Sequence, residues 1–234
     1  MDRRSFIESC TAAAACISAT VPFPALAADA KPRAYAPALL VDERGDPLKA
    51  SSLKAQVNYL FHYPFEATPV FLLDLGKPVP PRSLSTKTRE AYSWPGGVGP
   101  RQSVVAYCAI CAHKLVYPTR EVSFISFRKT RAQRGVQDQL IHCCADHSQY
   151  DPARGAEVLS GPATQPLCAV LLAYDRNADT MTAYATLGGE LFDDFFKKYE
   201  MKLSLEVGPN AKNAVTGQTV VRELDKFCRN SIQC

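Results

Sequence analysis

The sequence of 234 residues contains only four histidines and one tryptophan, and it has no internal repeat and no long run of one charge. Its 27 Lys and Arg residues are interspersed with 23 Asp and Glu residues, so the net charge is a mild +4. This pattern argues against a partner nucleic acid, which needs a basic stripe, and against a polybasic patch for a membrane surface. Seventeen prolines and twelve glycines favour short strands and many turns over long helices.

The apolar residues are arranged mainly as short strands. Hydrophobic residues make up 47% of the chain, enough to bury the core of one domain with appendages. Apolar or alternating segments rich in Val, Ile, Phe and Tyr lie at 69–75, 102–110, 121–129, 167–175 and 180–187. Residues 188–201 have the spacing of a short helix, with one apolar side formed by Leu191, Phe195, Phe196 and Tyr199. We expect an all-β fold with a short C-terminal helix that caps the sheets and takes no part in chemistry.

The first residues have the features of an export signal. Arg3 and Arg4 precede an uncharged run at 10–28, which contains a small-x-small cleavage site at 25–27. This arrangement resembles a twin-arginine signal peptide over residues 1–27, with the bacterial periplasm as its destination. The uncharged run is nearly long enough to cross a membrane, so an uncleaved leader that holds the protein at the membrane is the alternative.

The cysteine count suggests more than a disulfide scaffold. Cleavage of the leader removes Cys10 and Cys16 and leaves seven of the nine cysteines, which is an odd number. Disulfides persist in the periplasm. Twin-arginine export is associated with proteins that fold before they cross the membrane, as a protein that acquires a metal centre in the cytoplasm must. Some of the seven cysteines are therefore expected to have a role other than forming disulfides.

Two short segments combine cysteine with histidine. Cys111 and His113 form a C-x-H pair, Cys144 and His147 form a C-x-x-H pair, and residues 114–143 separate the pairs. Two thiolates and two imidazoles can hold tetrahedral zinc. They can also hold a [2Fe-2S] cluster with both cysteines on one iron and both histidines on the other. The spacing alone does not decide between them.

The residues around these pairs resemble a known family. "AICAHK" is similar to the first Rieske box, and "HSQYDPARGAEVLSGPATQPL" is similar to the second, including a Gly-Pro-Ala loop that covers the cluster. The detailed resemblance covers about residues 104–175. "FHYPFEATPVFLLDLGKP" is similar to the base-domain strands of periplasmic Rieske subunits such as the arsenite oxidase small subunit.

The resemblance implies a fold, a domain division and a cofactor. The Rieske fold has antiparallel sheets with an inserted cluster-binding subdomain. It would occupy residues 35–188, with cluster loops at about 108–168 and a helical or loop extension at 189–234. The ligands of the [2Fe-2S] cluster that the resemblance implies are Cys111, His113, Cys144 and His147.

One departure from the family concerns the disulfide that clips the two cluster loops in respiratory bc1-type proteins. The positions of its two cysteines are Val116 and Asp146 here, so that bridge is absent, as it is in oxygenase-type Rieske domains. A bridge between Cys108 and Cys143 could replace it; otherwise these two cysteines are buried strand residues.

A second departure concerns the register of the second loop. The family has one residue between the histidine ligand and the following serine, whereas His147 and Ser148 are adjacent. An ungapped alignment would put Cys143 and Asp146 at the ligand positions. Aspartate is a hard anionic ligand and a poor match for a neutral imidazole on iron. Cys144 and His147 keep one thiolate and one imidazole in the second loop. We therefore predict that these two residues are the ligands from this loop.

The remaining candidates have simpler expected roles. Ser148 and Tyr150 either donate hydrogen bonds to the cluster sulfurs or serve the turn. Cys228 and Cys234 are expected to close a small terminal loop, and Cys168 is expected in the core. His62 and His142 are expected to be structural.

Three function classes compete. A Rieske oxygenase also needs a mononuclear iron held by two histidines and a carboxylate, but no histidine follows His147. A zinc-stabilised, non-redox binding module is compatible with the two pairs and stays as the alternative. The favoured function is a one-electron carrier, a subunit of an oxidoreductase complex without substrate chemistry of its own. Its expected partners are a donor enzyme of the molybdenum type or a quinol-oxidising complex, and a cytochrome c-type acceptor.

Overall fold

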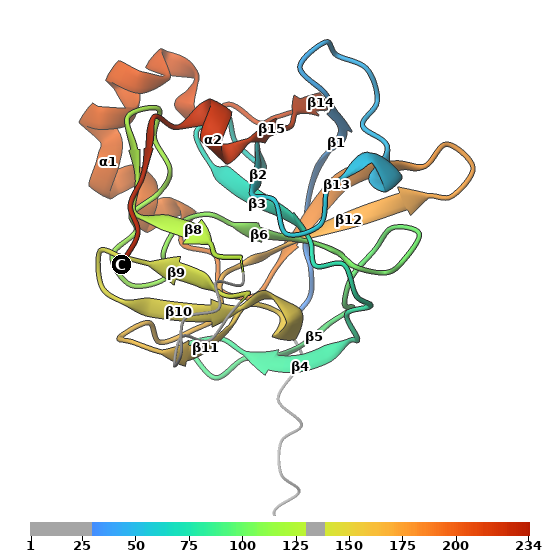
Figure 1. Cartoon of the computed structure of the whole chain (residues 1–234). Coiled ribbons are helices and arrows are strands. Elements are labelled where there is room, and N and C mark those ends of the chain that lie inside the picture. The colour runs from blue at the N-terminus through green and yellow to red at the C-terminus, as the bar shows by residue number, and fades with distance from the viewer. Residues whose placement is uncertain (1–29, 130–138) are drawn as a thin grey trace, which may run out of the picture.

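The computed structural model describes residues 30–129 and 139–234 of the protein. The leader predicted at residues 1–27 lies outside the described residues. The described part is built mainly of β-strands, with one longer helix late in the sequence (Figure 1). The prediction of an all-β fold with mainly antiparallel sheets and a short C-terminal helix is confirmed.

An eight-stranded sheet forms the larger part of the fold. Its strand order is β14, β1, β13, β12, β6, β3, β2 and β15, with β1 and β14 parallel and the other described neighbours antiparallel. The strands are β1 Arg33–Val41, β2 Tyr59–His62, β3 Pro69–Asp74, β6 Val104–Cys108, β12 Ala169–Asp175, β13 Thr180–Leu187, β14 Gly217–Val220 and β15 Arg222–Glu223. The segments predicted at 69–75, 102–110, 167–175 and 180–187 all fall in this sheet.

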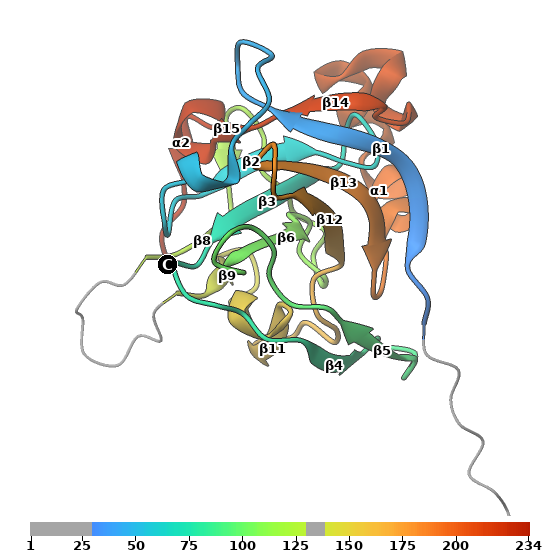
Figure 2. The same ribbon diagram turned by 90° about the vertical axis from the view of Figure 1, so that its right-hand side faces the viewer.

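The two edges of this sheet approach each other. The hydroxyl of Thr219 in β14 donates to the backbone C=O of His62 in β2 at 2.9 Å, and the N–H of His62 donates to that hydroxyl at 3.4 Å. The sheet is therefore nearly closed into a barrel, as its curl in Figure 2 shows. One face buries a core of its own, which includes Leu40, Phe61 and Leu72.

A second, four-stranded antiparallel sheet is inserted between β6 and β12. Its order is β11, β10, β9 and β8, with bounds β8 Ile125–Phe127, β9 Ile141–Cys143, β10 Ser148–Asp151 and β11 Glu157–Ser160. It packs on the larger sheet through a shared core that contains Phe71, Tyr107, Ile125, Ile141 and Tyr150, all fully buried. An inserted subdomain was predicted at this place in the chain.

Two small sheets and the helices complete the fold. β4 Arg82–Ser85 pairs with β5 Ala91–Trp94, and β7 Val122–Ser123 pairs in parallel with β16 Asn230–Ser231. The predicted strand at 121–129 is thus divided between β7 and β8. The helices are α1 Phe192–Glu206 and α2 Leu224–Phe227, and the 3-10 turns are η1 Ala50–Ser52, η2 Pro152–Arg154 and η3 Gly208–Lys212.

The helix α1 packs its aromatic side onto the sheets, as its spacing predicted. Phe195 is fully buried and Phe196 is buried beside it. Among the described residues, no helix combines the length and the apolar character needed to cross a membrane.

Candidate metal centre

The first loop follows β6 and carries Cys111 and His113. The N–H of Cys111 donates to the C=O of Val116 at 2.9 Å, and the N–H of Leu115 donates to the C=O of Cys111 at 3.0 Å, which closes a tight turn. Cys111 is fully buried, whereas the side chain of His113 is 37% exposed. The loop therefore presents a buried thiol with an imidazole at the surface beside it.

The second loop joins β9 to β10. Cys143 and Ser148 face each other across this hairpin, so residues 144–147 form its turn. The N–H of His147 donates to the C=O of Cys143 at 2.7 Å, and His147 itself has a left-handed φ of 62°. The thiol of Cys143 is fully buried, while His147 is exposed.

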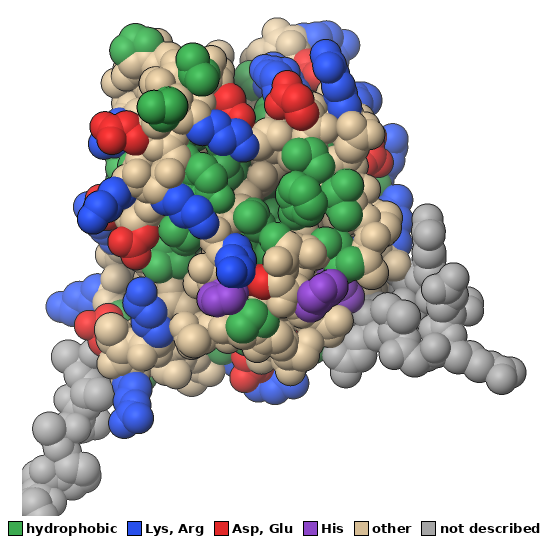
Figure 3. All heavy atoms as spheres, turned by 90° about the vertical axis from the view of Figure 1, so that its left-hand side faces the viewer, with side chains coloured by type: hydrophobic (Ala, Val, Ile, Leu, Met, Phe, Trp, Pro, Cys, Tyr) green, Lys and Arg blue, Asp and Glu red, His purple; other side chains and the backbone are tan. Residues whose placement is uncertain are grey.

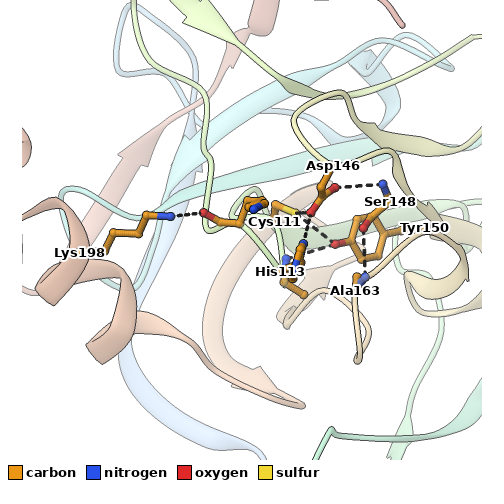
Figure 4. A network of polar contacts seen from close by, with 9 residues as sticks. Cys111, His113, Asp146, Ser148, Tyr150, Ala163 and Lys198 are labelled. Atoms are coloured by element: carbon orange, nitrogen blue, oxygen red, sulfur yellow. Dashed lines mark hydrogen bonds and ion pairs between the residues drawn. The ribbon is translucent and has the colours of Figure 1, made fainter.

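Donor side chains from the two loops come together (Figure 4). The sulfurs of Cys111 and Cys143 and a carboxylate oxygen of Asp146 all lie within 4.8 Å of one another. Oδ2 of Asp146 lies 3.2 Å from Sγ of Cys111 and 2.9 Å from Nδ1 of His113. Cys111, Cys143 and Asp146 are close enough to hold a metal ion, and His113 lies beside Asp146.

The two thiols shift each other's pKa in opposite directions. The pKa of Cys111 is lowered by a hydrogen bond from Cys143, with further help from the Tyr150 hydroxyl and from backbone N–H groups, although burial opposes the shift. The pKa of Cys143 is raised by the same hydrogen bond and by burial. A metal that binds both sulfurs would displace their protons.

Asp146 is a buried carboxylate that stays ionised. Burial alone would raise its pKa, but hydrogen bonds from the backbone N–H of Ser148 and from Cys143, Cys111 and His113 outweigh it and hold the pKa at about 2. Its side chain is only 2% exposed. The centre therefore contains one anionic oxygen donor at neutral pH.

Tyr150 connects the two loops. Its hydroxyl lies 3.5 Å from Sγ of Cys111 and accepts a hydrogen bond from the N–H of Ala112 at 3.1 Å. The ring is fully buried. The phenol can therefore donate to the sulfur of Cys111, one of the two roles predicted for Tyr150.

A third loop covers the second one. The hydroxyl of Ser148 accepts a hydrogen bond from the N–H of Ala163 at 3.1 Å. Gly161, with a φ of 91°, lies so close that a Cβ there would be 2.5 Å from the Cα of Ser148. Glycine is required at this position because no side chain fits. Ser148 thus anchors the cover loop in this structure. Of the two roles predicted for Ser148, this corresponds to the one in the turn and not to a hydrogen bond to a cluster sulfur.

The structure does not bring the predicted pair Cys144 and His147 to the first loop. Cys144 forms a disulfide with Cys234, and its Cα lies 5.6 Å from that of its partner. His147 points to the surface. The residues that lie beside the first pair are Cys143 and Asp146, the positions given by the ungapped alignment.

The disulfide corrects a second expectation. Cys228 and Cys234 do not close a small loop, because Cys228 is free and buried. After Cys228 the chain enters β16, which pairs in parallel with β7. Cys234 then lies beside the second loop, where it bonds to Cys144. Cys108 and Cys143 are both free thiols, so no bridge joins them, and Cys168 is buried as expected.

The helix α1 supports the first loop. The ring of Tyr117, just after this loop, lies 5.0 Å from that of Phe195 in an edge-to-face arrangement. Its hydroxyl donates to Glu206 at 2.7 Å, and Nζ of Lys198 donates to the C=O of Lys114 at 2.5 Å. The helix was expected to be a cap without a role at the site, but it holds the segment that carries the first donor pair.

The other two histidines are structural, as predicted. His142 is buried in β9, and burial together with the positive charge of Arg128 lowers its pKa to about 4. His62 lies in β2 with its ring 5.9 Å from that of Phe227.

The sequence matches no family model. Among solved structures, the chain is similar to the soluble domain of the Rieske protein II (soxF) from Sulfolobus acidocaldarius, with 23% identity and a TM-score of 0.47. The similarity covers 67% of this chain and 82% of that chain.

Proposed function

We propose that the protein is a one-electron carrier with a [2Fe-2S] cluster bound between its two loops. The observation that carries the proposal is the meeting of two buried thiols, Cys111 and Cys143, from separate loops beside a surface imidazole, His113. Thiolate ligands favour iron–sulfur clusters over the metals that prefer oxygen ligands. When bound, a cluster in which neutral imidazole replaces thiolate supplies a site that takes up one electron at a potential above that of an all-cysteine cluster.

The surrounding residues suit this role. The Tyr150 hydroxyl can donate to a sulfur of Cys111, and such hydrogen bonds stabilise the added negative charge of a reduced centre. The cover loop packs on the second loop and is anchored there by the hydroxyl of Ser148. His113 reaches the surface, so an electron would have a short path to a docked partner.

A zinc-stabilised binding module is the second candidate. Two ligands bonded to one tetrahedral zinc at about 2.0 to 2.3 Å lie roughly 3.3 to 3.8 Å apart. The 3.2 Å and 2.9 Å contacts of Asp146 with Cys111 and His113 are close to that spacing. Zinc would, however, give no function to the hydrogen bond between Tyr150 and the thiol.

The metal content tests the proposal. The protein purified without oxygen should contain two irons and two acid-labile sulfides per chain, and reduction should produce an EPR signal of low average g. Stoichiometric zinc without sulfide would overturn the proposal in favour of the binding module.

We also propose a periplasmic location and partners of the kind expected from the sequence. The leader with Arg3 and Arg4 supports export, and the Cys144–Cys234 disulfide suits an oxidising compartment. On the face in Figure 3, two histidine side chains reach the surface beside hydrophobic side chains. Such a face suits a docked partner, either an oxidoreductase subunit or quinol-oxidising complex as donor, or a cytochrome c-type acceptor.

A further inference from the structure

We infer that the centre is held by two cysteines, one histidine and one aspartate, with Asp146 in place of a second histidine. The inference rests on the proposed iron–sulfur function and assigns its ligands as Cys111, Cys143, His113 and Asp146. It follows from the register of the second loop, from the contacts of Asp146 and from the disulfide of Cys144.

Strand alternation fixes the register of the second loop. Ile141 and Cys143, two residues apart in β9, both belong to the core that also contains Cys111. Adjacent residues of a strand point to opposite faces, so Cys144 must point away from that core. It does so, and its sulfur is bonded to Cys234. A shift by one residue to make Cys144 a ligand would turn Ile141 out of the core.

The tight turn then decides between Asp146 and His147. Oδ1 of Asp146 accepts the N–H of Ser148 at 3.0 Å, which leaves Oδ2 free to face Cys111 and His113. His147, one residue later, sits at the left-handed corner of the turn with its side chain at the surface. For His147 to reach the thiols, the hairpin would have to lose the pairing of Cys143 with Ser148.

The four donors can be assigned in pairs to the two irons of a [2Fe-2S] cluster. The sulfurs of Cys111 and Cys143 lie within 4.8 Å of each other, and Nδ1 of His113 lies 2.9 Å from Oδ2 of Asp146. One pair offers two sulfurs to one iron, and the other offers a nitrogen and an oxygen to the second iron. A carboxylate adds a negative charge that a neutral imidazole does not, so this centre should have a lower reduction potential than one with two histidines.

The test counts histidine nitrogens on the reduced cluster. Protein labelled with ¹⁵N-histidine should show one strongly coupled nitrogen by pulsed EPR in the full chain. His147→Ala should leave that coupling, the iron and the sulfide unchanged. Asp146→His should keep the cluster, add a second coupled nitrogen and raise the potential, while Asp146→Ala should lose at least half of the cluster iron.

Two results would overturn the inference, and they can be told apart from failure of the proposed function. Two coupled nitrogens in the unaltered protein, with one lost in His147→Ala, would show that His147 is the ligand although the cluster function stands. Zinc without sulfide would instead overturn the proposed function together with this ligation. Circular dichroism of each variant separates loss of the cluster from loss of the fold.

Discussion

Cys144 is joined to Cys234 by a disulfide that spans 90 residues of sequence. The bond ties the segment after β16 to the second loop, directly beside Cys143. Arg128 donates to both sulfurs, at 2.8 Å to Cys144 and 3.1 Å to Cys234. The second loop is thus clipped from outside by a distant part of the chain, whereas the first loop is supported by α1.

Removal of this clip should weaken the fold and spare the cluster. Cys234→Ser should lower the free energy of unfolding by roughly 2–4 kcal/mol, because the reduced chain gains conformational freedom when unfolded. Urea unfolding and an iron assay measure the two effects. Cys144→Ser should behave in the same way, and the double variant should no longer respond to a mild reductant. Loss of iron in Cys144→Ser but not in Cys234→Ser would instead identify Cys144 as a ligand.

The Tyr150 hydroxyl should raise the reduction potential of the centre. Tyr150→Phe removes a hydrogen bond to Cys111 and should lower the potential by roughly 40 mV, which corresponds to about 1 kcal/mol for one electron. Potentiometric titration followed by EPR gives the value. Tyr107→Phe is the matched control, because its equally buried hydroxyl donates to the C=O of Pro152 at 2.7 Å and not to sulfur. Equal reduction potentials in Tyr150→Phe and Tyr107→Phe would show that the Tyr150 hydroxyl does not raise the potential.

The packing of α1 should stabilise the first loop as well as the fold. Phe195→Ala removes a fully buried ring that contacts Tyr117 and should cost roughly 3–5 kcal/mol of unfolding free energy. Amide exchange at Leu115 should also become faster. Met201→Ala, at an 81% exposed position of the same helix, should change stability by less than about 0.5 kcal/mol. If amide exchange at Leu115 is unchanged in Phe195→Ala, the packing of α1 does not stabilise the first loop.

Acid should destabilise the protein partly through His142. Its pKa is about 4 in the folded protein, against about 6.5 in an unfolded chain. Because the unfolded chain takes up this proton first, the free energy of unfolding should fall as the pH drops from about 6.5 to about 4. His142→Leu should lose less stability between pH 7 and pH 5 than the unaltered protein. Met201→Ala, at an exposed position without a titratable side chain, serves as the control and should keep the original pH dependence.

Export should depend on the paired arginines. Replacing Arg3 and Arg4 by lysine should leave folded, cluster-bearing protein in the cytoplasm, as measured by cell fractionation and iron content. A variant with Lys31→Arg, which keeps a positive charge outside the leader, is the control. Unchanged delivery to the periplasm would assign export to another signal.

Local sequence determined most of the strands and the place of the centre. Short apolar or alternating segments were enough to predict β3, β6, β12 and β13, because each strand must bury its side chains whatever it pairs with. The aromatic spacing of Phe195 and Phe196 likewise predicted α1. The two loops were recognisable because cysteine and histidine side by side are rare and chemically specific.

Tertiary structure alone decided which residues of the second loop face the first. Cys143 and Cys144 are chemically identical, and ligand chemistry favoured the reading with His147 over the one with Asp146. Which thiol points inward depends on the pairing of β9 with β8 and β10, since a shift of one residue reverses every side chain. The disulfide partner of Cys144 could not be predicted from the sequence either. A disulfide requires two Cα atoms within about 7 Å, and only the folded chain brings Cys234 that close to Cys144.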